Sequence, residues 1–271
     1  FLSVSCNAQL TQLALQLSPQ GVCINDAHFP IYTAGSNQLK PELSKQFNWG
    51  FQFKPTMQHI WSMDYWRIDM KNTLRQFPSA LVLSDPIQYA QYYTLVNNQL
   101  VMNLPTVNLG NSTKSGVDFS WAYRQPTEWG RFYAQVQGTR FLKSAQNIAP
   151  QLGWTSDLGA YSADSGSVTP TMRTQWTAGL LNGDWNAQVS VNHVTGYTDA
   201  DVSARDAQTF ELATVKGRKV PAFWTLDLNA NYQITRTTLL EAKVFNLLNK
   251  QAPLSFTQTS SVLNAYNTTY S

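Results

Sequence analysis

The stretch "WTLDLNANYQI", residues 224–234, alternates between apolar and polar side chains. Apolar residues occupy one parity and polar residues the other: Leu226, Leu228, Ala230, Tyr232 and Ile234 against Asp227, Asn229, Asn231 and Gln233. Successive side chains of a β-strand point to opposite faces, so the segment predicts a strand with one apolar and one polar face. The fold class then depends on what covers the apolar face, a second sheet or lipid.

A second alternating segment, "LLEAKVF" (239–245), follows after the three residues 235–237. A hairpin with a three-residue loop brings apolar side chains opposite apolar ones and polar opposite polar. The expected pairs are Tyr232–Leu240, Ala230–Ala242, Leu228–Val244, Asn231–Glu241 and Asn229–Lys243. The two segments therefore predict a hairpin with a continuous apolar face.

Residues 174–194 predict another hairpin, because Asn182-Gly183 is typical of a two-residue type I′ turn. Such a turn places apolar residues opposite one another on one face. The expected pairs are Leu181–Asp184, Leu180–Trp185, Ala178–Ala187 and Trp176–Val189. Turn chemistry and face pattern agree on this hairpin.

Two further segments show the same arrangement, residues 116–138 with a turn at 126–129 and residues 47–65 with a turn at 55–57. The apolar pairs expected there are Phe119–Val136, Trp121–Ala134, Tyr123–Phe132, Phe51–Trp61, Trp49–Met63 and Phe47–Tyr65. The sequence thus predicts at least four antiparallel hairpins.

The composition favours lipid over a second sheet as the cover of the apolar faces. Charged residues make up 13% of the 271 residues, about half the usual share, and aromatic residues also make up 13%, with nine Trp. The mean hydropathy is nevertheless −0.29, since Asn, Gln, Ser and Thr replace the missing charge. This balance is typical of a transmembrane β-barrel with a lipid-facing and a wet side. The net charge of +3 comes without a basic cluster, so nucleic acid is not an expected partner.

The lengths of the connections support the same interpretation. Turns within the hairpins are short, whereas the connections between hairpins are long, at residues 72–111, 143–172 and 198–221. Short turns at one end and long loops at the other are typical of outer-membrane barrels. We therefore predict an all-β, antiparallel transmembrane β-barrel with short periplasmic turns, long extracellular loops and outer-membrane lipid around it.

Several segments resemble the strands of TonB-dependent outer-membrane receptors. "SNQLKPELSKQFNWGFQFKP" (36–55) is similar to their "NP-x-LKPE-x-S" strand start, and "WSMDYWRIDMKN" (61–72) to their "S-x-DY-x-RI-x-I-x-N" strand. "VNLGNSTKSGVDFSWAY" (107–123) resembles their "N-x-G-x-x-x-x-x-G-x-[DE]" strand. "FWTLDLNANYQI" and "KVFNLLNKQAPLS" (223–255) resemble their closing strands. The order and spacing of these pieces carry the resemblance.

The resemblance implies a 22-stranded barrel filled by an N-terminal plug domain. It implies import of a scarce nutrient (siderophore-bound iron, a vitamin or a carbohydrate) across the outer membrane of a Gram-negative bacterium, powered through TonB. Residues 1–271 would be the C-terminal portion of such a barrel, about eight or nine strands, without the plug domain and the final strand. The TonB energy-transducing complex would then act through an N-terminal region missing from this chain, and the ligand would be a small molecule such as a siderophore.

Three other functions remain open at this stage. A small structural or adhesion barrel of about eight strands in the outer membrane would have a filled interior. An outer-membrane enzyme would need a converging nucleophile and base, and no nucleophile motif is present, so we expect no enzyme. A soluble sugar-binding β-protein would purify without detergent. No cofactor is indicated, and His28, His59 and His193 lack metal-ligand spacing.

Six charged residues are expected to face the barrel interior, because charge facing lipid is costly. They are Asp64, Asp118, Arg124, Asp227, Glu241 and Lys243. They could dock the plug or line a passage, or they could be solvated or paired across strands.

Loop residues are the other candidates for ligand contact. They are Tyr89, Tyr92, Tyr93, Trp154, Tyr161 and Arg205, and each could instead serve loop packing. Cys6 and Cys23 lie in an opening segment without strand periodicity. An isolated pair of this kind is read either as a loop disulfide, which requires an oxidising compartment, or as two free thiols.

Overall fold

A computed structural model describes residues 6–23, 31–36, 38–162, 165–205 and 212–255 of the chain. The described residues belong to two compact units. The smaller unit lies within Phe1–Ser44, Met70–Ser112 and Asn147–Trp154, and the larger within Lys45–Asp69, Thr113–Gln146 and Thr155–Ser271.

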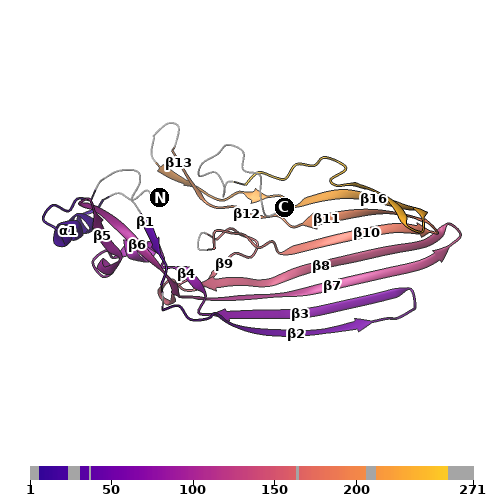
Figure 1. The fold of residues 1–271 in the computed structure, drawn as a ribbon, viewed down its shortest axis with the longest axis horizontal. Helices are drawn as coiled ribbons and strands as arrows, with labels where there is room; N and C mark the ends of the chain where they lie inside the picture. The colour runs from indigo at the N-terminus through magenta and orange to yellow at the C-terminus, as the bar shows by residue number, and fades with distance from the viewer. Residues whose placement is uncertain (1–5, 24–30, 37, 163–164, 206–211, 256–271) are drawn as a thin grey trace. The chain divides into compact units, whose positions relative to one another are not determined.

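The larger unit is built on one antiparallel sheet of nine strands, which confirms the predicted all-β antiparallel class. Eight long strands lie side by side in the order β17-β16-β11-β10-β8-β7-β3-β2, and the short β9 pairs with β8 (Figure 1). Their bounds are β2 Leu43–Phe53, β3 His59–Lys71, β7 Asn111–Thr127, β8 Gly130–Asn147, β9 Thr155–Ser156, β10 Met172–Asn182, β11 Trp185–Val194, β16 Phe223–Thr235 and β17 Thr238–Val244. Spatial order thus follows chain order, as four consecutive hairpins require.

The apolar face of this sheet is exposed. Trp49 is 62% exposed, Trp176 57% and Leu240 60%, although all three are large and apolar. Within the described residues no second sheet covers these side chains, as their exposure shows. So many exposed, large apolar side chains on one face indicate that this face contacts something other than water.

The hairpin that decides the fold has the expected register. Tyr232 lies opposite Leu240, and Leu228 lies opposite Val244. The loop itself is shorter than three residues, because Thr235 pairs with Thr238 and the register shifts between Gln233 and Thr235. A bulge therefore replaces the third loop residue and leaves the remaining pairs unchanged.

The predicted register of the hairpin formed by β10 and β11 is wrong by two residues. Asn182 pairs with Trp185, so Gly183 and Asp184 form the two-residue turn, and Gly183 has the positive φ of 55° that glycine tolerates best. The observed apolar pairs are Leu180–Ala187, Ala178–Val189 and Trp176–Val191. A shift by two keeps every side chain on its predicted face, which is why the alternation could not reveal it.

The other two turns also differ from their expected bounds. Strand β7 continues through Pro126 to Thr127, so the turn to β8 has only two residues, Glu128 and Trp129, instead of four. Strands β2 and β3 are separated by residues 54–58 instead of 55–57. The rings of Phe47 and Tyr65 are 6.2 Å apart, so this expected apolar pair shares one face.

The smaller unit contains a helix where an irregular segment was expected. Helix α1, Ala8–Leu17, buries Leu10, Leu13 and Ala14. This i, i+3, i+4 spacing places the three side chains on one side of the helix. The alternating leucines at 13, 15 and 17 and the shortness of the helix obscured it in the sequence.

A small mixed sheet supplies the rest of this unit. Strand β6 lies between β1 and β4 and also pairs with β5, and its contact with β1 is parallel. The core joins α1 to this sheet through Val82, Tyr93, Leu100, Met102 and Leu104. The elements are β1 Ile31–Ala34, β4 Leu74–Gln76, α2 Ser79–Ser84, η1 Ala90–Tyr92, β5 Tyr93–Val96, β6 Gln99–Asn108 and η2 Pro150–Leu152.

The long connection between β11 and β16 contains two short pairs of antiparallel strands. Strand β12 pairs with β15, and β13 pairs with β14. Their bounds are β12 Tyr197–Thr198, β13 Val202–Arg205, β14 Leu212–Val215 and β15 Lys219–Val220. No helix in the part of the chain that the structure describes is both long and apolar enough to cross a membrane.

Candidate functional site

A row of side-chain hydrogen bonds crosses four strands on the polar face of the larger sheet. Gln137 of β8 donates to Gln175 of β10 over 2.9 Å, and Gln175 donates to Asn192 of β11 over 2.8 Å. Asn192 donates in turn to Asp227 of β16 over 2.6 Å. The second oxygen of Asp227 accepts from the backbone N–H of Asn246 over 2.8 Å. Each amide both donates and accepts, so the row holds these side chains in fixed orientations.

The polar face continues toward β3 with shorter side chains. Thr139 donates to Asp118 over 2.6 Å, and the hydroxyls of Ser62 and Ser120 are 2.7 Å apart. Asp64 lies over Gly50 of β2, where a Cβ atom would come within 1.9 Å of the carboxylate. The absence of a side chain at position 50 therefore gives the Asp64 carboxylate its place on the sheet.

Two hollows lie on this face. The larger, of about 570 Å³, is lined among others by Ser62, Asp64, Asp118, Ser120, Gln137, Thr139, Arg173, Gln175 and Asn192. The smaller, of about 250 Å³, is lined by Gln175, Gln188, Ser190, Asp227, Leu228, Asn229, Lys243 and Phe245. We call the larger one the polar hollow. Its lining consists mainly of amides, hydroxyls and carboxylates, so it can bind a ligand through many hydrogen bonds.

Four of the six charged residues predicted to face inward line these hollows: Asp64, Asp118, Asp227 and Lys243. Glu241 forms an ion pair with Lys243 over 2.9 Å, and both side chains are more than 40% exposed, so the pair contributes little to stability. Arg124 is exposed and lines neither hollow. That this face is the wall of a barrel lumen remains a prediction.

The sequence did not single out Arg173 or the aromatic pair Trp66 and Phe141, which also lies on the polar face. Trp66 follows Asp64 by two positions on the same face, and its ring centroid is 5.9 Å from that of Phe141 in an edge-to-face arrangement. Trp66 packs over Gly116, where a Cβ atom would lie 2.7 Å from the indole. Parity alone places these residues on the polar face, but only the order of the strands shows that they meet.

The apolar face has a hollow of its own. It measures about 510 Å³ and is lined by Phe51, Phe53, Trp61, Ser62, Met63, Phe119, Ser120, Trp121 and Val136. His59 accepts a hydrogen bond from the Trp121 indole over 3.1 Å on the same side of the sheet. This chemistry suits hydrocarbon and not a polar ligand.

The loop candidates differ in what they can contact. Tyr93 is 5% exposed, its hydroxyl donates to the Val82 carbonyl, and burial raises its pKa to about 12. Tyr93 therefore packs in the core of the smaller unit, which agrees with loop packing, the alternative to ligand contact. Tyr89 and Tyr92 are half-buried and pack against Phe77, with ring centroids 5.9 and 4.5 Å from that of Phe77; the Tyr92 ring is stacked and the Tyr89 ring is tilted.

The remaining loop candidates are more scattered. Trp154 is 56% exposed, and Tyr161 is half-buried with its backbone N–H donating to the Thr198 carbonyl. Arg205 ends strand β13, but its side chain lies outside the described residues, as does His28.

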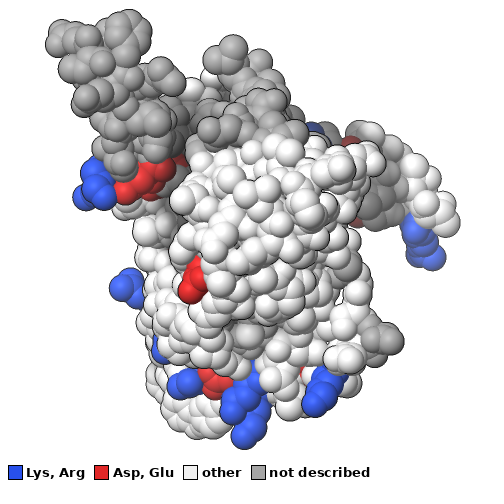
Figure 2. Space-filling model, turned by 90° about the vertical axis from the view of Figure 1, so that its left-hand side faces the viewer, with Lys and Arg blue, Asp and Glu red and all other residues white. Residues whose placement is uncertain are grey.

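Charged side chains are sparse on the surface drawn in Figure 2. Among the described residues, no three histidine, cysteine or acidic side chains converge as ligands of a metal ion.

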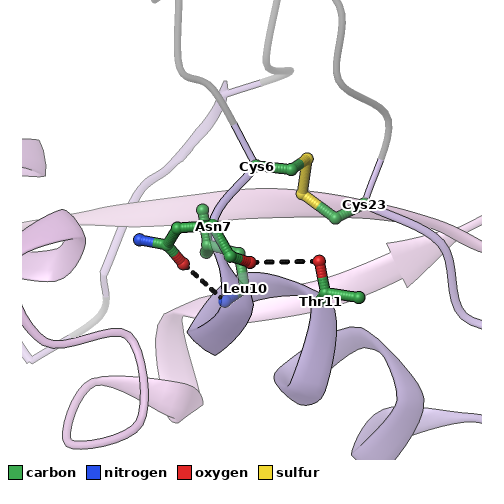
Figure 3. The surroundings of a disulfide bond; sticks show 5 residues. All are labelled: Cys6, Asn7, Leu10, Thr11 and Cys23. Carbon is green, nitrogen blue, oxygen red and sulfur yellow. Dashed lines mark hydrogen bonds between the residues drawn. A yellow bond between two sulfur atoms is a disulfide. The ribbon is translucent and has the colours of Figure 1, made fainter.

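Cys6 and Cys23 are joined by a disulfide in the structure (Figure 3). Cys6 directly precedes Asn7, whose side chain accepts from the Leu10 N–H over 2.8 Å and caps helix α1. Thr11 donates to the Asn7 carbonyl over 3.0 Å. The disulfide therefore fixes the chain at the start of α1 to the segment that follows the helix.

Comparison with solved structures shows the same fold in larger receptors. The ferric enterobactin receptor PfeA of Pseudomonas aeruginosa, in complex with enterobactin, matches 82% of this chain with 15% identity and a TM-score of 0.56. The FrpB iron transporter of Neisseria meningitidis matches 82% with 14% identity and a TM-score of 0.53. The chain spans 28% of the first receptor's length and 29% of the second's.

The sequence comparison gives the family. No curated protein sequence matched the chain. The family model described as TonB dependent receptor-like, beta-barrel, matches residues 9–247, which include all the strands of the large sheet. The chain therefore belongs to the family of TonB-dependent receptor β-barrels.

Proposed function

We propose that this chain is part of the barrel of an outer-membrane receptor that imports a scarce nutrient, with energy supplied through TonB, in a Gram-negative bacterium. One observation carries the proposal: the sheet exposes a continuous apolar face and backs it with a hydrogen-bonded polar face. Lipid is the natural cover for the first, and a wet or plugged interior for the second.

The two edges of the sheet support a larger barrel. Among the described residues, strands β2 and β17 each have one neighbour in the sheet, and every residue in both is exposed. In lipid, each backbone N–H and C=O must be paired. We therefore infer that further strands continue the sheet from both edges and close it. The share of the solved receptors that this chain spans, somewhat over a quarter, fits the same inference.

Import in this proposal needs no covalent chemistry. A small molecule would bind from outside to the loops and the outer part of the interior, and a plug domain elsewhere in the protein would then move to let it pass. Enterobactin in the PfeA structure supports a siderophore as one candidate ligand, beside a vitamin or a carbohydrate. The polar face would provide the wall that the plug and the ligand contact.

The test is uptake in cells. The full reading frame that encodes this chain is expressed in a Gram-negative host, and the protein is located by membrane fractionation. We expect it in the outer membrane, and we expect ligand uptake that stops on deletion of tonB or on addition of a protonophore. Active import would be refuted if the protein is found in the outer membrane but neither treatment changes uptake. That result would favour the structural or adhesion barrel.

A further inference from the structure

The charged side chains in the polar hollow restrict the charge of the ligand that it can bind. Asp64 and Asp118 bring two carboxylates to its wall, and Arg173 brings one guanidinium. The two carboxylates and the guanidinium of the lining thus leave one net negative charge. An anionic ligand would meet two like charges there, which opposes binding.

We propose that the polar hollow binds a neutral, polyhydroxylated ligand, an oligosaccharide, in preference to an anionic metal chelate. This inference rests on the proposed function, because it names the substrate class of the same importer.

The hydrogen-bonding groups of the polar hollow match sugar hydroxyls. A hydroxyl both donates and accepts, and the lining offers both kinds of partner. Carboxylate oxygens of Asp64 and Asp118 accept, whereas the amides of Gln137, Gln175 and Asn192 donate and accept. The amides are already oriented by the row that ends at Asp227, so little conformational entropy is lost when a ligand binds.

An aromatic surface completes the match. Trp66 lies two positions along β3 from Asp64, which lines the polar hollow, and Phe141 packs edge-on against its ring. Because Gly116 has no side chain, the indole lies close to the sheet. A sugar ring has an apolar C–H face as well as hydroxyls, and a large aromatic side chain covers such a face while neighbouring polar groups bind the hydroxyls.

The experiment measures binding to the full-length receptor, purified in detergent from outer membranes. The probes are three neutral oligosaccharides (a maltodextrin, a cellodextrin and a chito-oligosaccharide) and the anionic chelate ferric enterobactin, each titrated by calorimetry. The variants are Trp66→Ala, Trp66→Phe and Asp118→Asn. Trp176→Ala is the matched control, since it removes an indole from the apolar face of the same sheet. Heat-modifiable migration in SDS gels verifies that each variant is folded.

We expect at least one oligosaccharide to bind, and Trp66→Ala and Asp118→Asn to weaken it by about tenfold or more. Trp66→Phe should retain part of the affinity, and Trp176→Ala all of it. The inference is overturned if only ferric enterobactin binds, if neither ligand class binds, or if oligosaccharide affinity is unchanged in Trp66→Ala. TonB-dependent uptake is measured in a separate experiment. A failure of the oligosaccharide inference can therefore be distinguished from a failure of the proposed function.

Discussion

Asn192 and Asp227, 35 residues apart in the chain, are joined by a hydrogen bond of 2.6 Å that links strands β11 and β16. The same carboxylate accepts from the backbone N–H of Asn246. Asp227 therefore connects the row of amides on the polar face to the segment that follows β17. Charge-assisted bonds of this kind are roughly twice as strong as neutral ones.

Replacement of this carboxylate should be destabilising. Asp227→Ala removes both bonds and leaves the Asn246 N–H without its acceptor, so we expect the free energy of unfolding to fall by about 2 kcal/mol. Urea unfolding of the full-length protein in detergent measures the loss. Asn231→Ala, on the same strand and face, is the control and should cost clearly less. Equal losses for the two variants would contradict the role of Asp227.

The tryptophans should divide by face when the protein is placed in membranes. Trp49, Trp61 and Trp176 are on the apolar face, so brominated phospholipid should quench their fluorescence strongly. Trp66, on the polar face, should keep most of its emission. The measurement compares variants that each retain one of these tryptophans. Strong quenching of Trp66 together with bright emission from Trp176 would refute the assignment of the faces.

Removal of the disulfide should loosen the smaller unit. Cys6 and Cys23 are 17 residues apart, and a cross-link that closes a loop of this size stabilises by about 3 kcal/mol in the chain-entropy description. The double substitution Cys6→Ser and Cys23→Ser should therefore lower the hydrogen-exchange protection of α1 amides. The amides of β16 and β17 serve as the internal reference and should be unaffected. Unchanged protection in α1 would show that its packing alone holds the helix.

Acidification should loosen the base of the hairpin formed by β13 and β14. The Asp201 carboxylate accepts two hydrogen bonds, from the Lys216 ammonium over 2.8 Å and from the Gly217 backbone N–H over 2.7 Å. These bonds lower the pKa of the Asp201 carboxyl. A carboxyl whose folded pKa is depressed stabilises the folded state above its unfolded pKa of about 4, and the contribution is lost as the pH falls through the folded pKa. Protection factors of the hairpin amides should thus be higher at neutral pH than at about pH 3. In Asp201→Asn this difference should vanish, and a difference of the same size in that variant would exclude Asp201 as its source.

Much of the large sheet could be predicted because local rules act directly on it. Leu228 and Val244 were expected to face each other, and they do, because the bulge between Gln233 and Thr235 makes up for the shorter loop and keeps the predicted register. The polar positions of Asp64, Asp118, Asp227 and Lys243 follow from the same alternation, and all four line the hollows.

The register of β10 and β11 shows the limit of that rule. Trp176 pairs with Val191 instead of Val189, and both arrangements keep the same side chains on the apolar face. Alternation has a period of two residues, so it cannot distinguish registers that differ by two. The backbone of the turn decides between them, and Gly183 takes the position that requires a positive φ.

By itself, the sequence determined which side chains share a face, because the parity of a strand is set residue by residue along the chain. Only the tertiary structure decided which of them meet. Asp118, Arg173 and Asn192 come from three strands, and they line one hollow because β7, β8, β10 and β11 are adjacent in the sheet. The helix α1 and the parallel contact of β1 with β6 likewise depend on burial against segments distant in the chain, which no local period encodes.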